Sequence, residues 1–245
     1  MDYIWYAIPI VMFAGVVRGF SGFGFAVIAV VGLNFFFDPT VSVLIVLSLD
    51  LICSINLWRQ ALAQADFGTL KVLIIGSLLG IPIGYTFLLL IPSDTLKLLI
   101  CLTILILSLL LFSNFTPFNA NKKHTKLGFG LASGAGTASA SIGGPMIVYY
   151  MLSSQLSTQS QRATMILFFI ASEALTVFIL IGGGLVNEVV INGLVILVIP
   201  TLVAVRYGQH LFNQHPPKSL KSFALPIMLM VAILGIIKSS VTLLS

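Results

Sequence analysis

Three ionisable side chains lie inside long apolar stretches of the sequence, where a charge is costly. Arg18 stands just before a glycine-rich interruption of the first stretch, and Asp50 and Glu173 lie deep in two later ones. A charge at the centre of a lipid bilayer costs ~2.5 kcal/mol or more, so such residues are functional candidates by default. A guanidinium can hold an oxyanion through two N–H donors, and a buried carboxyl can alternate between charged and neutral forms. Arg18 therefore predicts an anion site, with Asp50 and Glu173 as candidates for proton coupling.

A purely structural role for the same residues stays open at this point. Asp50 is near the middle of the apolar stretch that follows Arg18, so the two could pair permanently and only hold two segments together. Asp50 and Glu173 could likewise be hydrogen-bonded structural carboxyls.

Two glycine-rich interruptions, at 19–24 and 133–145, carry the remaining candidate ligands. Glycine costs a helix about 1 kcal/mol relative to alanine, so each interrupted stretch is predicted to form two half-helices. The second half-helix of each would begin at the interruption and point its free N–H groups, with about half a positive charge, at the membrane centre. The predicted substrate-binding residues are Arg18, Gly19, Ser21, Gly22, Phe23, Gly24, Thr137, Ser139, Ser141, Gly143, Gly144 and Pro145.

Composition indicates that these segments belong to a membrane protein. Of the 245 residues 58% are apolar and 8% are charged, and the mean hydropathy is +1.12. Soluble domains carry about 25% charged residues, so a water-soluble globule is excluded. In a membrane protein, a net charge of +5 indicates basic loops that set the orientation of the chain in the bilayer. We therefore expect no nucleic-acid partner. Cys53 and Cys101 lie in apolar runs as small hydrophobic residues, and we predict no metal site and no cofactor.

Six apolar stretches are uninterrupted and long enough to span a bilayer, which takes about 20 residues. They cover 40–59, 69–91, 95–113, 160–182, 189–210 and 218–243, and the interrupted ones cover 3–37 and 127–152. Half-helices of ~11 to 15 residues would measure about 16 to 22 Å, which reaches the midplane of a ~30 Å core without crossing it. We therefore predict two re-entrant hairpins.

The basic residues favour this topology over one with eight crossings. Eight crossings would place six cations on one side of the membrane and five on the other, and this near-equal distribution does not indicate which side is cytoplasmic. With two hairpins, one side holds Arg59, Lys71, Lys122, Lys123, Lys126, Arg162, Arg206, Lys218 and Lys221, and the other holds Lys97 and Lys238. An excess of nine over two predicts that the first side is cytoplasmic and that both termini lie outside.

The two halves of the chain also repeat each other. A shift of 119 residues places Gly22–Phe25 over Ser141–Gly144 and Ser54 over Glu173, and Pro92 matches Pro216 at a shift of 124. We predict an all-α, polytopic membrane protein of two inverted repeats, 1–115 and 127–245, joined by a cytoplasmic linker at 116–126. Each repeat would hold one hairpin and three spanning helices, an organisation common in secondary transporters.

These features resemble the TauE/SafE family, also called the toluene-sulfonate uptake permease family. Residues that map onto its motif are Gly19, Gly22, Gly24, Gly143, Gly144 and Pro145. The first copy departs from the motif, because no proline follows shortly after Gly22–Gly24. The resemblance implies a transporter, most often an exporter, of small sulfur-containing anions such as sulfite, thiosulfate or organosulfonates.

Two other functions remain as alternatives. An anion channel could use the same pair of opposed hairpins. Gly19-Phe20-Ser21-Gly22 is similar to the nucleophile motif of rhomboid proteases, but such chemistry needs a base near the serine, and His124, His210 and His215 are predicted in loops or at helix ends. We therefore predict that the protein is not an enzyme. Its expected partners are a small anion, the lipid bilayer of the cell (inner) membrane and protons, and a homo-oligomer is left open.

Overall fold

The computed structural model describes residues 4–113, 119–215, 225–227, 229–230 and 232–237, and in this part of the chain every regular element is a helix. The helices are α1 (Ile4–Ser21), α2 (Phe25–Leu33), α3 (Pro39–Leu62), α4 (Phe67–Leu90), α5 (Ser93–Phe112), α6 (Lys123–Ala140), α7 (Gly143–Leu152), α8 (Thr158–Gly182) and α9 (Glu188–Gln214). A further short apolar helix covers Leu225–Ile237. The predicted span 218–243 and the cations Lys218, Lys221 and Lys238 lie wholly or partly outside the described residues.

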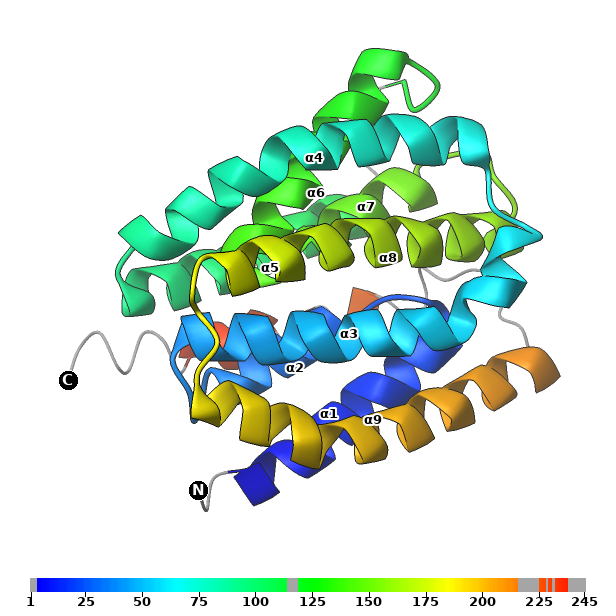
Figure 1. The fold of residues 1–245 in the computed structure, drawn as a ribbon. Coiled ribbons are helices and arrows are strands. Elements are labelled where there is room, and N and C mark those ends of the chain that lie inside the picture. The colour runs from blue at the N-terminus through cyan, green and yellow to red at the C-terminus, as the bar shows by residue number, and fades with distance from the viewer. Residues whose placement is uncertain (1–3, 114–118, 216–224, 228, 231, 238–245) are drawn as a thin grey trace.

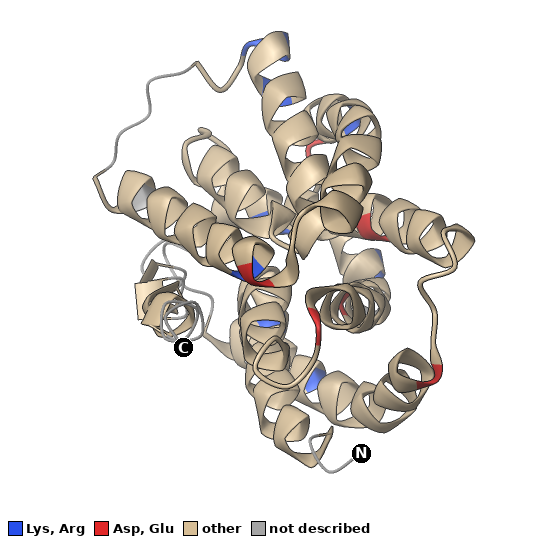
Figure 2. Cartoon of the chain, turned by 90° about the vertical axis from the view of Figure 1, so that its left-hand side faces the viewer, with Lys and Arg blue, Asp and Glu red and all other residues tan. Residues whose placement is uncertain are grey.

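Length and composition make five of the described helices suitable for crossing a membrane, namely α1, α4, α5, α8 and α9. Many large apolar side chains on them are exposed, for example Leu90 and Phe178, each 73% exposed. Charged residues are few along the helices, as Figure 2 shows. An apolar outer surface with this little charge suits a chain that is solvated by lipid. The protein is therefore a multi-pass membrane protein.

Both interrupted stretches fold back on themselves. Gly22 and Gly24 have φ values of 80° and 94°, a left-handed conformation that glycine adopts without strain, and they turn the chain between α1 and α2. The side chain of Ile10 in α1 lies against Gly32 near the end of α2, so α2 returns antiparallel along α1. In the second stretch, the ring of Phe129 in α6 lies 5.4 Å from that of Tyr150 near the end of α7.

The lengths of these helices differ from the sequence prediction. The first limbs, α1 and α6, each have 18 residues, and the second limbs, α2 and α7, have 9 and 10. The glycine-rich segment 133–140 is helical, and α6 ends only at Ala140. The prediction that the break begins at residue 133 was wrong, because glycines there allow close packing against α4.

Small residues bring two pairs of helices into backbone contact. A Cβ atom added at Gly76 or Gly80 of α4 would overlap backbone of α6, and would lie 2.8 Å from the amide nitrogen of Leu131 or Ala135. Gly19 of α1 meets Val205 and Gln209 of α9 in the same manner. Without a hydrophobic driving force between helices in lipid, such close contact is a main source of attraction. In both pairs the contacts advance together along the two helices, so the pairs are parallel.

The helices α3 and α8 lie between these two pairs, with α1 and α9 at the bottom and α4 and α6 at the top of Figure 1. The amide of Asp66, just after α3, donates to Thr164 Oγ1 in the first turns of α8 at 2.9 Å. Asp50, in the middle of α3, reaches Glu173, in the later half of α8. The helices α3 and α8 are therefore antiparallel, and they bring both membrane carboxyls to one level.

Candidate functional site

Arg18 is almost completely buried at the end of α1, with 1% of its surface exposed. Its Nε lies 2.8 Å from Asp50 Oδ1, and one terminal nitrogen donates to the Gly22 carbonyl at 2.6 Å. The other terminal nitrogen donates to the hydroxyl of Ser54, one turn beyond Asp50 on α3. The guanidinium carbon lies 4.8 Å from the centre of the Phe169 ring. The ion pair that sequence analysis offered as the structural alternative is thus present.

The carboxylate of Asp50 is surrounded by donors. Besides Arg18, it accepts a hydrogen bond from the backbone N–H of Ala26, in the first turn of α2. The N-terminal end of a helix favours a negative charge, because its N–H groups have no partner within the helix. Asp50 therefore occupies the position that sequence analysis predicted for a bound anion.

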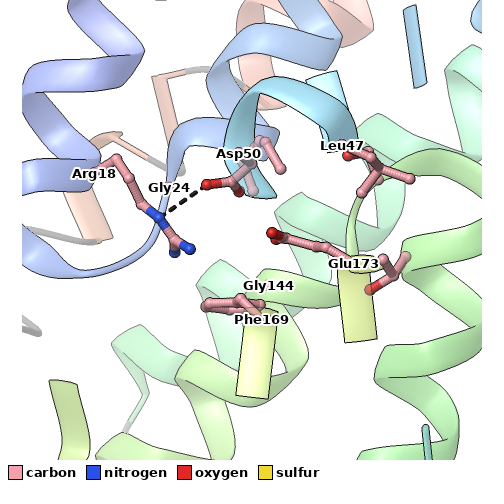
Figure 3. Close-up of a pocket in the computed structure, with 11 residues that line it drawn as sticks. Arg18, Gly24, Leu47, Asp50, Gly144, Phe169 and Glu173 are labelled. Carbon is pink, nitrogen blue, oxygen red and sulfur yellow. Dashed lines mark ion pairs between the residues drawn. The ribbon is translucent and has the colours of Figure 1, made fainter. Parts of the chain in front are cut away.

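Glu173 faces Asp50 from α8, and their side chains are hydrogen-bonded. Two carboxyl groups share a hydrogen bond only when one of them carries a proton. Figure 3 shows the Glu173 carboxyl pointing toward Arg18 and Asp50. Its Oε2 is buried and has no hydrogen-bond partner among the described residues. The cluster therefore brings one guanidinium and two carboxyl groups together.

A small cavity lies beside this cluster (Figure 3). Seven of the predicted residues line it, namely Arg18, Gly24, Asp50, Thr137, Ser141, Gly144 and Glu173. The cavity has room for about one water molecule. An oxyanion needs more space than this cavity offers.

The second limbs of both hairpins contribute their first residues to the cavity. Gly24 precedes α2 and Gly144 lies in the first turn of α7, and both line the wall. Ser141, at the break between α6 and α7, is 1% exposed, and its Oγ has no hydrogen-bond partner within the described part of the chain. Two helix N-termini, a guanidinium and an unpartnered hydroxyl together form an arrangement that can bind an anion.

The other predicted residues are not part of the cavity wall, and these are Gly19, Ser21, Gly22, Phe23, Ser139, Gly143 and Pro145. Several of them shape the hairpins. Gly19 packs against α9, and Gly143 accepts a hydrogen bond on its carbonyl from Ser133 Oγ at 2.9 Å. These residues support the turns that carry Gly24 and Ser141.

Sequence analysis missed two residues that contact Arg18 and one further buried cation. Ser54 lies four residues after Asp50, and this spacing predicts that the two side chains lie on the same face of a helix. Phe169 lies four residues before Glu173 on α8, so the same spacing predicts that Phe169 and Glu173 share a helix face. Arg162 was counted only as an orienting cation at the start of the predicted span 160–182, whereas it lies in the first turns of α8 and is only 4% exposed.

The surroundings of Ser21 do not resemble those of a catalytic nucleophile. Its hydroxyl lies 2.8 Å from the carbonyl oxygens of Val17 and Phe23, and the residue is fully buried. The three histidines, His124, His210 and His215, are all exposed. A serine that donates to backbone carbonyls without a base at hand has no activated oxygen.

No curated protein and no solved structure matches the chain. A family model described as "Sulfite exporter TauE/SafE" matches residues 7–235, and the match includes both hairpins and every residue of the cavity wall. Since it extends over nearly the whole sequence, the protein belongs to the TauE/SafE family of sulfite-exporter-type membrane transporters.

Proposed function

We propose that the protein is a secondary transporter, acting as an exporter, that binds a small sulfur-containing anion such as sulfite, thiosulfate or an organosulfonate beside Arg18. The observation that carries this proposal is the position of the Asp50 carboxylate. It is bound by a guanidinium and by an N–H at the start of α2, which are the donors an oxyanion needs. Asp50 occupies these donors until the substrate binds.

The substrate takes the place of Asp50 on Arg18 when the site opens. A sulfur oxyanion offers several oxygens, which can accept from Arg18, Ser141 and the N-terminal amides of α2 and α7 together. The cavity beside Arg18 has room for only about one water molecule, which favours alternating access over an anion channel that stands open. Alternating access predicts that anion flux saturates with substrate concentration and that its turnover is far below the rate of a channel.

Binding of substrate is coupled to a proton by charge balance. With Asp50 ionised and one proton on the carboxyl pair, Arg18 is neutralised in the empty site. A monovalent anion on Arg18 would leave Asp50 as an extra buried negative charge, which is very unfavourable in a low dielectric. Uptake of one proton by Asp50 restores neutrality. Glu173 is its hydrogen-bond partner in both states.

Asp50→Asn is expected to uncouple anion binding from protons. The neutral amide leaves Arg18 free for the substrate, so the apparent Kd should become independent of pH. In the unchanged protein it should weaken as pH rises, by up to about tenfold per unit for one proton. Both measurements use an alkylsulfonate, a monovalent anion that does not itself bind protons near neutral pH, and proton uptake is followed with a pH indicator when it is added to purified protein in weak buffer.

Glu173→Gln is the matched comparison, because a neutral glutamine resembles the protonated glutamate and leaves Asp50 able to titrate. We expect this variant to keep proton uptake. Loss of uptake in Glu173→Gln together with its retention in Asp50→Asn would assign the proton to Glu173 instead.

The two hairpins are re-entrant in this proposal, and the antiparallel arrangement of α3 and α8 supports it. If α4 and α5 each cross the membrane, α5 runs in the direction of α3. A crossing α6–α7 segment would then make α8 parallel to α3, whereas a segment that turns back makes it antiparallel, as observed through Asp66 and Thr164.

The inverted repeat is supported by matching helix pairs. The first hairpin limb of each half packs in parallel against a long helix of the other half, α1 on α9 and α6 on α4. In each of the two repeats, 1–115 and 127–245, a long helix thus packs against the hairpin of the other repeat.

This topology places both termini outside the cell. A cysteine introduced at residue 2 or 245 should react with a membrane-impermeant thiol reagent added outside intact cells. Labelling only after the cells are opened would reject this orientation.

The substrate class is tested by binding to the purified protein. Sulfite, thiosulfate and an alkylsulfonate are compared by their effect on the unfolding temperature of the protein. An alkylcarboxylate with the same charge as the alkylsulfonate is the matched control. We expect the sulfur oxyanions to raise it in a saturable manner. Stabilisation by the carboxylate alone would overturn the substrate class.

A further inference from the structure

Arg162 is a second buried cation, and the anion site described above does not use it. One terminal nitrogen donates to the Gly19 carbonyl at 2.8 Å, and the guanidinium carbon lies 4.1 Å from the centre of the Phe212 ring. Its Nε is buried without a hydrogen-bond partner, and no acidic side chain pairs with it in the described ranges. A buried guanidinium that holds only a carbonyl and an aromatic face retains unused capacity for an anion.

The α1–α2 turn separates Arg162 from the cavity. Arg18 donates to the Gly22 carbonyl from one side, and the aliphatic stem of Arg162 packs against Gly22 from the other. The two guanidiniums are near enough to repel each other electrostatically. Among the described residues, Asp50 pairs with Arg18, and no acidic side chain pairs with Arg162. The end of α1 therefore brings two guanidiniums together with one ion-paired carboxylate.

We propose that Arg162 forms a second subsite for the same small oxyanion, on the side of the membrane where α8 begins. When the α1–α2 turn moves away from α8, Arg162 loses the Gly19 carbonyl, and an oxygen of the anion takes its place as the acceptor. The anion then passes between Arg162 and Arg18 without crossing an uncharged region. This subsite rests on the proposed function, because it serves the same substrate.

The subsite exists on one side only. In the internal repeat the position of Arg162 corresponds to Val43, which is fully buried and apolar. An anion that leaves toward the other side therefore meets no second cation at the equivalent place. The side where α8 begins is the predicted cytoplasmic side, so the subsite would collect substrate for export.

The test is uptake of radiolabelled sulfite by the full-length protein in vesicles sorted for a single orientation. Arg162→Gln is expected to raise the KM about tenfold when sulfite is on the side where α8 begins, which corresponds to about 1.4 kcal/mol. The KM from the opposite side should change less than about twofold, since Arg18 and its donors are intact. Arg162→Lys keeps the charge but not the planar fork, and should raise the KM less than Arg162→Gln.

Arg206→Gln is the matched control, because Arg206 is an exposed arginine of α9, the helix that carries Phe212. It removes the same charge from the protein without touching the α1–α2 turn, and we expect its KM to be unchanged from either side. An unchanged KM in Arg162→Gln would overturn the subsite. An equal rise from both sides together with a lower unfolding temperature would assign Arg162 a structural role and overturn it as well. If the unchanged protein neither binds nor takes up sulfite, the proposed function itself fails.

Discussion

Arg18→Gln is expected to lower anion transport at least about 100-fold, which corresponds to about 2.7 kcal/mol of lost substrate interaction. In the proposed function, the substitution removes the cation that neutralises the substrate and the planar guanidinium that orients it. A glutamine amide offers only a neutral donor in its place. Transport is measured as initial uptake of radiolabelled sulfite into vesicles, normalised to the amount of correctly folded protein.

A double variant separates this role from a purely structural one. Arg18→Gln alone leaves Asp50 as an unpaired buried charge, which costs about 3 to 5 kcal/mol. Arg18→Gln combined with Asp50→Asn removes both charges and should recover much of the unfolding temperature. If Arg18 binds substrate, the double variant is stable but still does not transport. Recovery of transport along with stability would show that Arg18 only holds α1 to α3.

Gly80→Ala is expected to have the largest effect on folding. Its methyl group would overlap the Leu131 carbonyl and approach the Ala135 amide nitrogen to 2.8 Å, and neither is a flexible side chain that can give way. Forcing α4 and α6 apart removes their close contact, at a cost of about 3 kcal/mol. Thermal unfolding in detergent and the monodisperse fraction after gel filtration should both fall.

Gly128→Ala provides the control for this prediction. Gly128 lies on α6, but a Cβ added there would have no atom within 4 Å. Since alanine favours a helix more than glycine does, this variant should be as stable as the unchanged protein or slightly more so. Equal stability of Gly80→Ala and Gly128→Ala would contradict the backbone contact between α4 and α6.

The positions of the long helices could be predicted from the sequence because hydropathy marks them directly. Their partners could not be predicted in this way. Glycine in an apolar stretch has two uses, to break a helix or to let another helix approach, and one chain alone does not distinguish them. Gly22 and Gly24 break the helix, as their positive φ values show, whereas Gly134 lies within α6 and contacts Ser77 of α4. The choice depends on a neighbour that is distant in sequence.

The candidate site was predictable where burial itself was the signal. Arg18, Asp50 and Glu173 are unusual in their surroundings, and the structure brings all three to one cavity. Arg162 gave no such signal, because it follows a polar segment and its first neighbours resemble a loop. Its burial results from the end of α1 and from Phe212 of α9. A cation near the end of a span is identified as buried only when the packing of other segments is known.

The contact between α1 and α9 has a consequence for how the protein is made. The helix α9, which packs closely against Gly15 and Gly19 of α1, is synthesised only after the helices α2 to α8. Until then Arg18 is already held by Asp50 and Ser54 of α3, by the Gly22 carbonyl and by the Phe169 ring of α8, whereas the Gly15 and Gly19 face of α1 is open to lipid or to other chains. A face of α1 is therefore covered only after α9 is made, and we expect ribosome-bound chains that stop before α9 to retain an α1 hairpin that a protease can still reach.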